Sequence, residues 1–237
     1  MDRTTFPGEV DSALARAAES PAYRSRILRR RWLCAGTLEI ELDRPSGFTF
    51  VPGQRIRLFR GEDWREYSPV SAPGDQSLTL CVRVIPGGRF TPWLASCPEG
   101  SEIAFSEPCG YFVYRRSARP ACFVATGTGI APFVSMARSG LSGFTLLHGA
   151  RLPEEVYYRE VFEARSARYV PCLSSAAAAP EPPLGSFPGR VTEYAEKVLS
   201  GGPFDFYLCG NRDMVRDMTR IVDERFEGSR VFVEVFF

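Results

Sequence analysis

The sequence predicts two domains of different class: an antiparallel β-barrel, followed by an α/β domain with a doubly wound parallel sheet. Evenly spaced alternating strands with little helical pattern fill the first half, and continuous apolar strands alternate with helical segments in the second. A length of 237 residues is enough for two small cores. The expected division is an N-terminal extension at 1–25, the barrel at 26–114 and the α/β domain at 115–237.

The expected barrel strands alternate between apolar and polar residues, as strands with one buried face do. They lie at 38–42, 56–60, 78–84 and 103–105. One short helix interrupts them, for which we expect Thr91 as N-cap and Pro92 at the first helical position.

The α/β half begins with the apolar run 121–125, which is typical of a strand buried on both faces. A charged linker at 114–120 precedes it, and a loop rich in Ser, Ala and Pro is expected at 174–190. Further strands are expected at 144–148, 204–209 and 231–237, and helices at 131–138, 154–167, 191–199 and 213–226.

Composition excludes several classes of function. With 29 Lys+Arg against 28 Asp+Glu, the net charge of +1 gives no support for nucleic-acid binding. One His and seven scattered Cys without a CxxC pair give no zinc or iron–sulfur spacing, so no metal is expected. The chain shows neither a signal-peptide core nor an apolar run of about 18 residues, and its cysteines suit reduced thiols, so we expect a cytoplasmic protein without a membrane span.

Two motifs in the barrel half carry groups suited to a nucleotide. Arg65-Glu66-Tyr67-Ser68 offers a guanidinium for a phosphate, an aromatic ring for stacking and a hydroxyl for a ring nitrogen. Gly88-Arg89-Phe90-Thr91 offers backbone donors and a hydroxyl to a second phosphate. Each motif alone is equally compatible with ordinary structure: a surface Arg beside a packed Tyr, and a hairpin turn with an N-cap.

Two further motifs follow buried strands of the second half. Thr126-Gly127-Thr128-Gly129 leads into a helix, where free N–H groups attract an anion, although it lacks the G-x-G-x-x-G pattern. Cys209-Gly210-Asn211, with Met214 beyond it, places a thiol at the carboxyl end of the sheet, where ligands bind in such folds. A structural turn and a buried strand-end Cys are the alternatives.

In this order the motifs resemble those of the ferredoxin–NADP+ reductase family, over residues 26–237. The stretches 109–113, 146–151 and 208–217 are similar to its bacterial branch. The resemblance implies an FAD-binding barrel and an NADP(H)-binding sheet, with FAD and NADPH as cofactors and NADH as a possible alternative.

The resemblance also implies roles for barrel residues. Arg65 would hold the FAD pyrophosphate, Tyr67 would stack on the isoalloxazine, and Ser68 would bond the nitrogen that accepts hydride. The 88–91 segment would bind the pyrophosphate from the other side, and Val82 and Val84 would line the ribityl chain.

In the second half, the resemblance assigns the nucleotide's phosphates to the turn at 126–132 and the nicotinamide to the Cys209 motif. Phe236 would stack on the flavin where nicotinamide must bind, and Phe237 would cover the adenine of FAD; both stand where Tyr and Trp are more usual. Glu234 matches an acidic residue near the flavin that assists proton transfer or positions the partner.

The nucleotide preference depends on cations for the 2′-phosphate of NADPH. Arg151 and Arg190 match family positions, whereas Ser174-Ser175 stands where the family has Ser-Arg. We expect NADPH rather than NADH as the nucleotide.

The implied function is an FAD-dependent oxidoreductase, expected as a monomer, that passes electrons between NADPH and a separate ferredoxin or flavodoxin. An NADH-dependent flavin or cytochrome reductase, and an electron-transfer subunit of a larger redox complex, are the alternatives. Five arginines, Arg24, Arg26, Arg29, Arg30 and Arg31, would steer an acidic carrier or form a solvated strand face.

Overall fold

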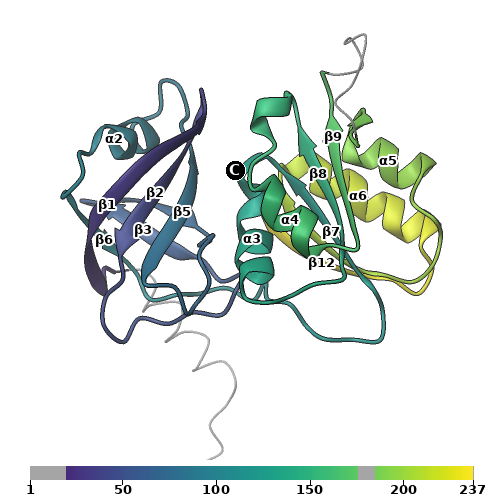
Figure 1. Cartoon of the computed structure of the whole chain (residues 1–237), viewed down its shortest axis with the longest axis horizontal. Coiled ribbons are helices and arrows are strands. Elements are labelled where there is room, and N and C mark those ends of the chain that lie inside the picture. The colour runs from purple at the N-terminus through teal and green to yellow at the C-terminus, as the bar shows by residue number, and fades with distance from the viewer. Residues whose placement is uncertain (1–19, 176–184, 237) are drawn as a thin grey trace, which may run out of the picture. The chain divides into compact units, whose positions relative to one another are not determined.

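The computed structural model describes residues 20–175 and 185–236. The chain divides into two compact units, with the boundary between Val113 and Tyr114 (Figure 1). In the described part of the chain, no helix is long and apolar enough to cross a membrane.

The first unit is a six-stranded antiparallel barrel with the strand order β4-β3-β6-β1-β2-β5. The bridge between Pro69 and Leu80, with a 2.8 Å hydrogen bond from Val70 N–H to the Thr79 carbonyl, joins the segment after β4 to β5 and closes it. The expected barrel is therefore confirmed. Its elements are β1 (Tyr23–Cys34), β2 (Thr37–Asp43), β3 (Ile56–Arg60), β4 (Asp63–Tyr67), β5 (Ser77–Arg83), α2 (Phe90–Ser96) and β6 (Glu102–Phe105).

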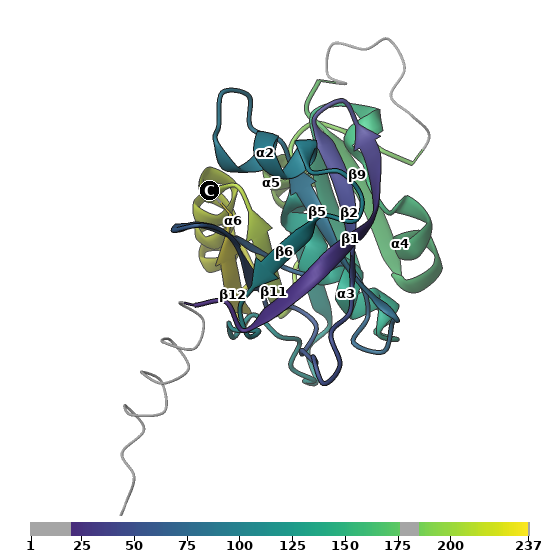
Figure 2. The same ribbon diagram turned by 90° about the vertical axis from the view of Figure 1, so that its left-hand side faces the viewer.

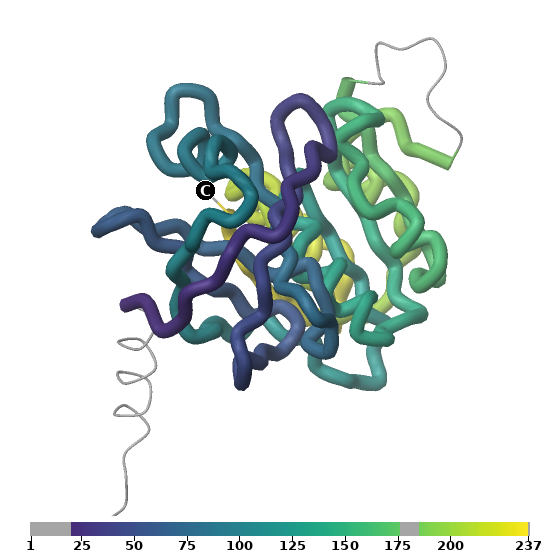
Figure 3. The backbone as a smooth tube through the Cα atoms, turned by 60° about the vertical axis from the view of Figure 1, so that its left-hand side comes forward, coloured from purple at the N-terminus to yellow at the C-terminus, as the bar shows by residue number. Residues whose placement is uncertain are grey.

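The longest barrel strand, β1, was not among the strands expected from the sequence. Its 12 residues include three consecutive arginines, Arg29 to Arg31, and a register shift after Ile27 breaks its alternation. The strand begins at Tyr23, so residues 23–25 do not belong to the extension expected at 1–25, of which 1–19 lie outside the described residues. It is the long purple strand of Figure 2 and continues through a hairpin into β2 (Figure 3).

The start of the short helix α2 also differs from expectation. It begins at Phe90 with Arg89 as N-cap, and no side chain caps it. The hydroxyl of Thr91 instead accepts a 2.9 Å hydrogen bond from the backbone N–H of Ile85, because the loop folds back onto the helix. Thr91 is therefore not the N-cap.

The second unit is a six-stranded parallel sheet with the order β10-β9-β8-β7-β11-β12, as the sequence predicted. Figure 1 shows α3 and α4 on one face and α5 and α6 on the other. Its strands are β7 (Ala121–Thr126), β8 (Thr145–Ala150), β9 (Arg168–Leu173), β10 (Phe187–Pro188), β11 (Asp205–Gly210) and β12 (Arg230–Val235). Its helices are η1 (Gly127–Ile130), α3 (Ala131–Arg138), η2 (Pro153–Glu155), α4 (Arg159–Arg165), α5 (Val191–Lys197) and α6 (Arg212–Arg225).

Three expectations for this unit need correction. The helix expected at 154–167 is split into η2 and α4, because Tyr158 takes a left-handed conformation with φ 58°. Strand β9, which contains Pro171, was missed, and β10 lies inside the loop expected at 174–190, of which 176–184 is outside the described residues. The last strand ends at Val235 rather than at Phe237.

The linker after Val113 is fixed to the second unit. Ser117 Oγ donates a 2.5 Å hydrogen bond to Asp205 Oδ2, and the backbone N–H of Arg115 donates to Tyr207 Oη at 3.0 Å. Arg119 Nε donates to the Gly228 carbonyl at 2.8 Å. The charged linker therefore belongs structurally to the α/β unit.

The carboxyl ends of β7 and β11 approach each other so closely that only glycine fits. A Cβ on Gly129 would lie 2.6 Å from the Cys209 carbonyl carbon. A Cβ on Gly210, whose φ is +134°, would lie 2.7 Å from the Thr126 carbonyl oxygen. Thr126 Oγ1 accepts a 2.9 Å hydrogen bond from Asn211 N–H and joins the two ends.

The single histidine lies inside this sheet, on β8. His148 is fully buried, and its Nδ1 lies 3.2 Å from Tyr169 Oη. Burial, with the nearby Arg159 guanidinium, lowers the His148 pKa to about 3. The imidazole is therefore a neutral core group.

We expect His148 not to titrate near neutral pH. Because the unfolded chain takes up this proton near pH 6.5 and the folded chain only near about pH 3, the free energy of unfolding should fall as pH drops through that window and should not depend on His148 above it. The imidazole NMR signals, unambiguous with one His, should stay constant from about pH 5 to about pH 8. A titration midpoint close to 6.5 would contradict the burial.

Replacing Gly129 by Ala should weaken the second unit. The added methyl overlaps the Cys209–Gly210 backbone, which cannot yield as a flexible side chain does, so the free energy of unfolding should fall by about 1–3 kcal/mol in urea denaturation. Gly201→Ala is the matched control, because its Cβ meets nothing within 4 Å and its φ is not left-handed. Equal effects of the two substitutions would show that the close approach is not limiting.

Candidate functional site

The inner face of β4 carries two residues of the R-x-Y-S motif. Arg65 pairs with Leu58 of β3 and Tyr67 with Ile56, and both β3 partners are buried in the barrel core. Arg65 is exposed, and its Cζ lies 5.7 Å from the ring centroid of Phe90 at the start of α2. The fold therefore brings the first motif next to the second, and β4 contains Arg65, Glu66 and Tyr67 although no strand was expected there.

Two hydroxyls of this motif are buried without a hydrogen-bond partner among the described residues. They are Tyr67 Oη and Ser68 Oγ, and Ser68 is only 2% exposed. Burial raises the pKa of Tyr67 despite the opposing charge of Arg65, so its hydroxyl stays protonated. Leaving such a group unsatisfied costs about 1–3 kcal/mol. Both hydroxyls are therefore available to hydrogen-bond a ligand at this face.

Some polar groups of the loop that enters α2 already form hydrogen bonds within the loop. The backbone N–H of Gly88 donates to the Ile85 carbonyl at 3.0 Å, and Thr91 Oγ1 accepts from Ile85 N–H. The Thr91 hydroxyl keeps its own proton to donate. Arg89 extends into solvent with a 3.5 Å ion pair to Asp63.

The two valines expected along a ligand differ in position. Val82 is fully buried within the barrel core, whereas Val84 is partly buried and packs against that core. Only Val84 therefore has side-chain surface exposed.

The carboxyl edge of the parallel sheet collects the motifs of the second unit. The turn at 126–132 folds as η1 and the start of α3, and the Cys209 motif lies against it through Gly129 and Gly210. Asn211 is the N-cap of α6, because its Oδ1 accepts from the N–H groups of Asp213 at 2.8 Å and Met214 at 3.3 Å. Asn211 was expected only as part of the Cys209 motif, although an Asn before a helical run is the usual signal of an N-cap.

Cys209 and Glu234 face each other in the register of β11 and β12. Cys209 is fully buried and Glu234 is 9% exposed. Burial, reinforced by the Glu234 carboxylate, raises the Cys209 pKa well above its usual value, so the thiol is neutral. Phe236 joins them, because its backbone N–H donates to the Gly210 carbonyl at 3.0 Å, while Phe237 lies outside the described residues.

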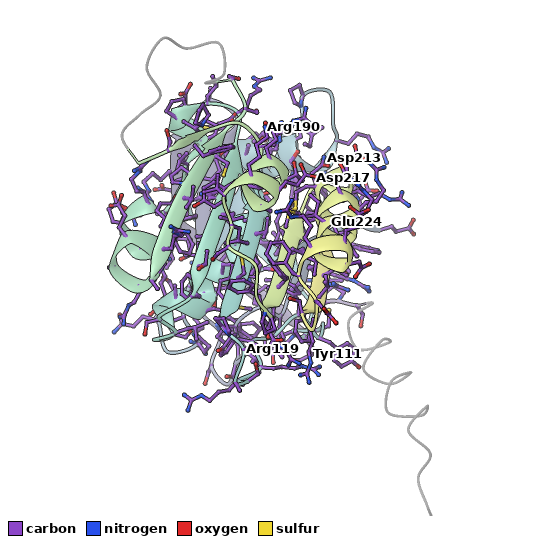
Figure 4. The ribbon with its side chains drawn as sticks, turned by 90° about the vertical axis from the view of Figure 1, so that its right-hand side faces the viewer. Tyr111, Arg119, Arg190, Asp213, Asp217 and Glu224 are labelled. Carbon is purple, nitrogen blue, oxygen red and sulfur yellow. The ribbon has the colours of Figure 1, made fainter. Side chains whose placement is uncertain are left out.

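Register also places Arg151 in one row with Gly189, the residue before Arg190. Ala150, Leu173 and Pro188 are paired across β8, β9 and β10, so Arg151, Ser174 and Gly189 follow in the next row. Arg151 and Arg190 are exposed, and neither guanidinium has an ion pair within the described residues. In Figure 4, Arg190 and Arg119 lie at opposite ends of this unit.

The arginine cluster on β1 is less basic than the sequence suggests. Three of its five members form cross-strand ion pairs with glutamates, so most of the charge is compensated locally. The pairs are Arg24 with Glu102 at 2.8 Å, Arg29 with Glu41 at 3.2 Å and Arg31 with Glu39 at 2.9 Å. This arrangement favours the solvated strand face over a docking patch.

The described residues contain no group of three His, Cys, Asp or Glu side chains that could hold a metal ion. All seven cysteines are free thiols.

Comparison with known proteins gives matches to both units. The oxidoreductase FAD-binding domain matches residues 35–114, and the oxidoreductase NAD-binding domain matches residues 123–220. A solved ferredoxin NADP+ reductase from Neisseria gonorrhoeae with bound FAD and NADP superimposes with a TM-score of 0.79 at 23% identity, covering 91% of this chain and 98% of that one. This likeness supports the fold.

Curated relatives fall into two groups. The toluate 1,2-dioxygenase electron transfer component of Pseudomonas putida is 31% identical over 86% of this chain, and the naphthalene 1,2-dioxygenase system ferredoxin–NAD(P)+ reductase component of the same organism is 32% identical over 92%. This chain spans only 64% and 66% of their lengths. Ferredoxin–NADP reductase B of Sorangium cellulosum is 30% identical over 83% of this chain and 89% of its own length. The chain therefore belongs to the ferredoxin–NADP+ reductase family of flavoenzymes, with FAD and a nicotinamide nucleotide as its cofactors.

Proposed function

We propose that this protein passes electrons between NADPH and a separate one-electron carrier of the ferredoxin or flavodoxin type. The observation that carries the proposal is the pair of buried hydroxyls, Tyr67 Oη and Ser68 Oγ, that no described residue satisfies beside Arg65. Bound FAD supplies the chemistry that links two-electron hydride transfer to one-electron transfer. The names of relatives, a ferredoxin–NADP reductase and several electron transfer components, support a protein carrier.

In the barrel, each residue of the motif has a separate task. The exposed Arg65 guanidinium binds the flavin pyrophosphate, since a guanidinium forms paired hydrogen bonds with phosphate oxygens. The ring of Tyr67 stacks on the isoalloxazine. Ser68 donates a hydrogen bond to the ring nitrogen that accepts hydride, which orients the ring and polarises that atom.

In the α/β unit, the backbone N–H groups at the start of η1 and α3 bind the phosphates of the nicotinamide nucleotide. The neutral Cys209 thiol offers the nicotinamide a polarizable, uncharged contact surface rather than a nucleophile. Glu234 beside it supplies the nearest carboxyl group in the sheet register.

Arg151 and Arg190 carry the preference for NADPH. Arg151 and Gly189 follow the paired ends of β8 and β10, whose backbones lie about 10 Å apart across β9, and Arg190 is the next residue after Gly189. Both side chains are long enough for their guanidinium groups to converge on one 2′-phosphate between them.

A second candidate is the reductase component of an oxygenase system. It is favoured by the relatives from toluate and naphthalene dioxygenase systems, which match 86% and 92% of this chain. The two candidates share the flavin and nucleotide chemistry and differ in the protein that receives the electrons.

The visible spectrum of the purified protein tests the proposal. We expect a yellow protein that NADPH bleaches without oxygen and that oxidised ferredoxin or flavodoxin then restores. A protein that stays colourless after incubation with FAD would refute the proposed function, and bleaching by NADH alone would reject NADPH as donor. Recovery only with an oxygenase-system carrier would favour the second candidate.

Substituting Arg151 or Arg190 by Ala should affect NADPH selectively. Losing one guanidinium–phosphate contact should raise KM for NADPH roughly tenfold, with kcat and the KM for NADH nearly unchanged. Arg225→Ala is the matched control. Arg225 is also an exposed arginine, but it lies at the C-terminal end of α6, whereas the Cys209 motif leads into the N-terminal end of that helix. Equal changes for the two nucleotides, or an unchanged KM for NADPH in both variants, would remove these arginines from 2′-phosphate recognition.

A further inference from the structure

Glu66, the second residue of the R-x-Y-S motif, points away from the face that carries Arg65 and Tyr67. Successive side chains of a strand point to opposite faces, and Glu66 pairs in register with Arg57 of β3, one residue along from the buried Leu58. Glu66 therefore lies between Arg65 and Tyr67 along β4, with its carboxylate on the outer face of the sheet.

This carboxylate is held by two arginines. Glu66 Oε1 accepts from Arg57 Nε at 3.0 Å, and Glu66 Oε2 forms an ion pair with Arg55 Nε at 2.9 Å. All three side chains are at least 70% covered, with 27%, 18% and 29% exposed for Glu66, Arg57 and Arg55. The Arg57 guanidinium also lies 4.3 Å from the ring centroid of Trp64, so the β3–β4 hairpin is clamped on its outer face.

Arg55 is itself anchored to the end of the barrel. Its backbone N–H donates to the Cys109 carbonyl at 2.9 Å, and Cys109 N–H donates back at 2.8 Å. The Arg55 side chain passes over Gly110, where a Cβ would lie 3.7 Å from Arg55 Cγ. Glu66 therefore connects β4 to a fixed point outside the hairpin.

The position of β4 in the sheet makes this connection important. The strand lies at the edge of the sheet order and pairs along its length only with β3; the Pro69–Leu80 bridge lies beyond its end. A slip of one residue would turn Arg65 and Tyr67 to the outer face. The ladder to β3 resists such a slip from one side of β4, and the carboxylate held by two arginines adds a second restraint.

We infer that Glu66 is a positioning residue for the flavin, which acts by holding β4 in the register that presents Arg65 and Tyr67 inward. The inference rests on the flavin-binding roles proposed for those two residues. It predicts that removing the Glu66 carboxylate weakens flavin binding although Glu66 does not touch the flavin.

The test compares Glu66→Ala with Glu41→Ala. Glu41 is a matched control, because it is also 27% exposed and forms a cross-strand ion pair, to Arg29 at 3.2 Å, on the β1–β2 ladder. Flavin-free protein is titrated with FAD, with flavin fluorescence as the signal, and its thermal unfolding midpoint is measured separately. We expect the Kd for FAD to rise roughly tenfold in Glu66→Ala and less than about twofold in Glu41→Ala, with similar small losses in the midpoint.

An unchanged FAD Kd in Glu66→Ala, or an equal rise in Glu41→Ala, would overturn the inference and leave Glu66 as an ordinary surface ion pair. If Glu66→Ala does not fold, Glu66→Gln removes the charge with little change of shape and is held to the same comparison with Glu41→Gln. Arg65→Ala separates the underlying proposal: an unchanged FAD Kd in that variant would reject the flavin-binding role of the inner face itself.

Discussion

The α/β unit depends on one constraint, the close approach of the carboxyl ends of β7 and β11. Gly129 and Gly210 leave no room for a Cβ between β7 and β11, and Thr126 joins the ends through Asn211. This contact fixes where η1 begins and where α6 is capped, since Asn211 serves both connections. The N–H groups of one turn and the thiol of Cys209 are thereby held at one edge of the sheet. The glycines that resemble a phosphate-binding motif are first a packing requirement, and any phosphate site is a consequence of that packing.

The barrel faces a different problem, because β4, the strand proposed to contact the flavin, lies at a sheet edge. In the second unit, β7 and β11 each have a neighbouring strand on both sides, whereas β4 has a full ladder on one side only. Side-chain contacts on the outer face, from Glu66 to Arg55 and Arg57, supply what the backbone ladder lacks there. Alternation along β4 thus places the residues proposed to bind the flavin, Arg65 and Tyr67, on one face and the ion-paired Glu66 on the other.

Periodicity was a good guide to the fold where the pattern was regular. It gave β3 and α3 with their observed bounds, because their apolar positions repeat without interruption. It failed for β1, where consecutive arginines pair with glutamates on β2, and for β9, where Pro171 interrupts a buried strand. These elements are stabilised by contacts with distant segments, which no local pattern records. The left-handed Tyr158 that divides the helix expected at 154–167 was equally invisible, since a non-glycine residue gives no local signal for that conformation.

For the candidate site, the sequence located the motifs but not the partners of their side chains. The second roles of Thr126 and Asn211, and the ion pair of Arg24 with Glu102, depend on pairing between segments remote in sequence. Glu39 and Glu41, which pair with Arg31 and Arg29, come from the next strand of the same hairpin. The β1 arginines show the same limit. The sequence left open whether they steer a carrier or form a solvated strand face, and glutamates from β2 and β6 pair with three of the five in three dimensions.

The buried titratable groups bear on the kind of chemistry this protein performs. Burial lowers the pKa of His148 to about 3 and raises the pKa values of Cys209 and Tyr67, so each of the three is held in its neutral form. An acid–base enzyme needs the opposite, a side chain whose pKa lies near the working pH. Groups locked in the neutral state instead provide stacking surfaces, hydrogen bonds and an apolar environment, which is what a redox cofactor requires from its protein. The absence of a poised base among these three groups is therefore consistent with a flavoenzyme in which the cofactor carries the reaction and the chain supplies its orientation.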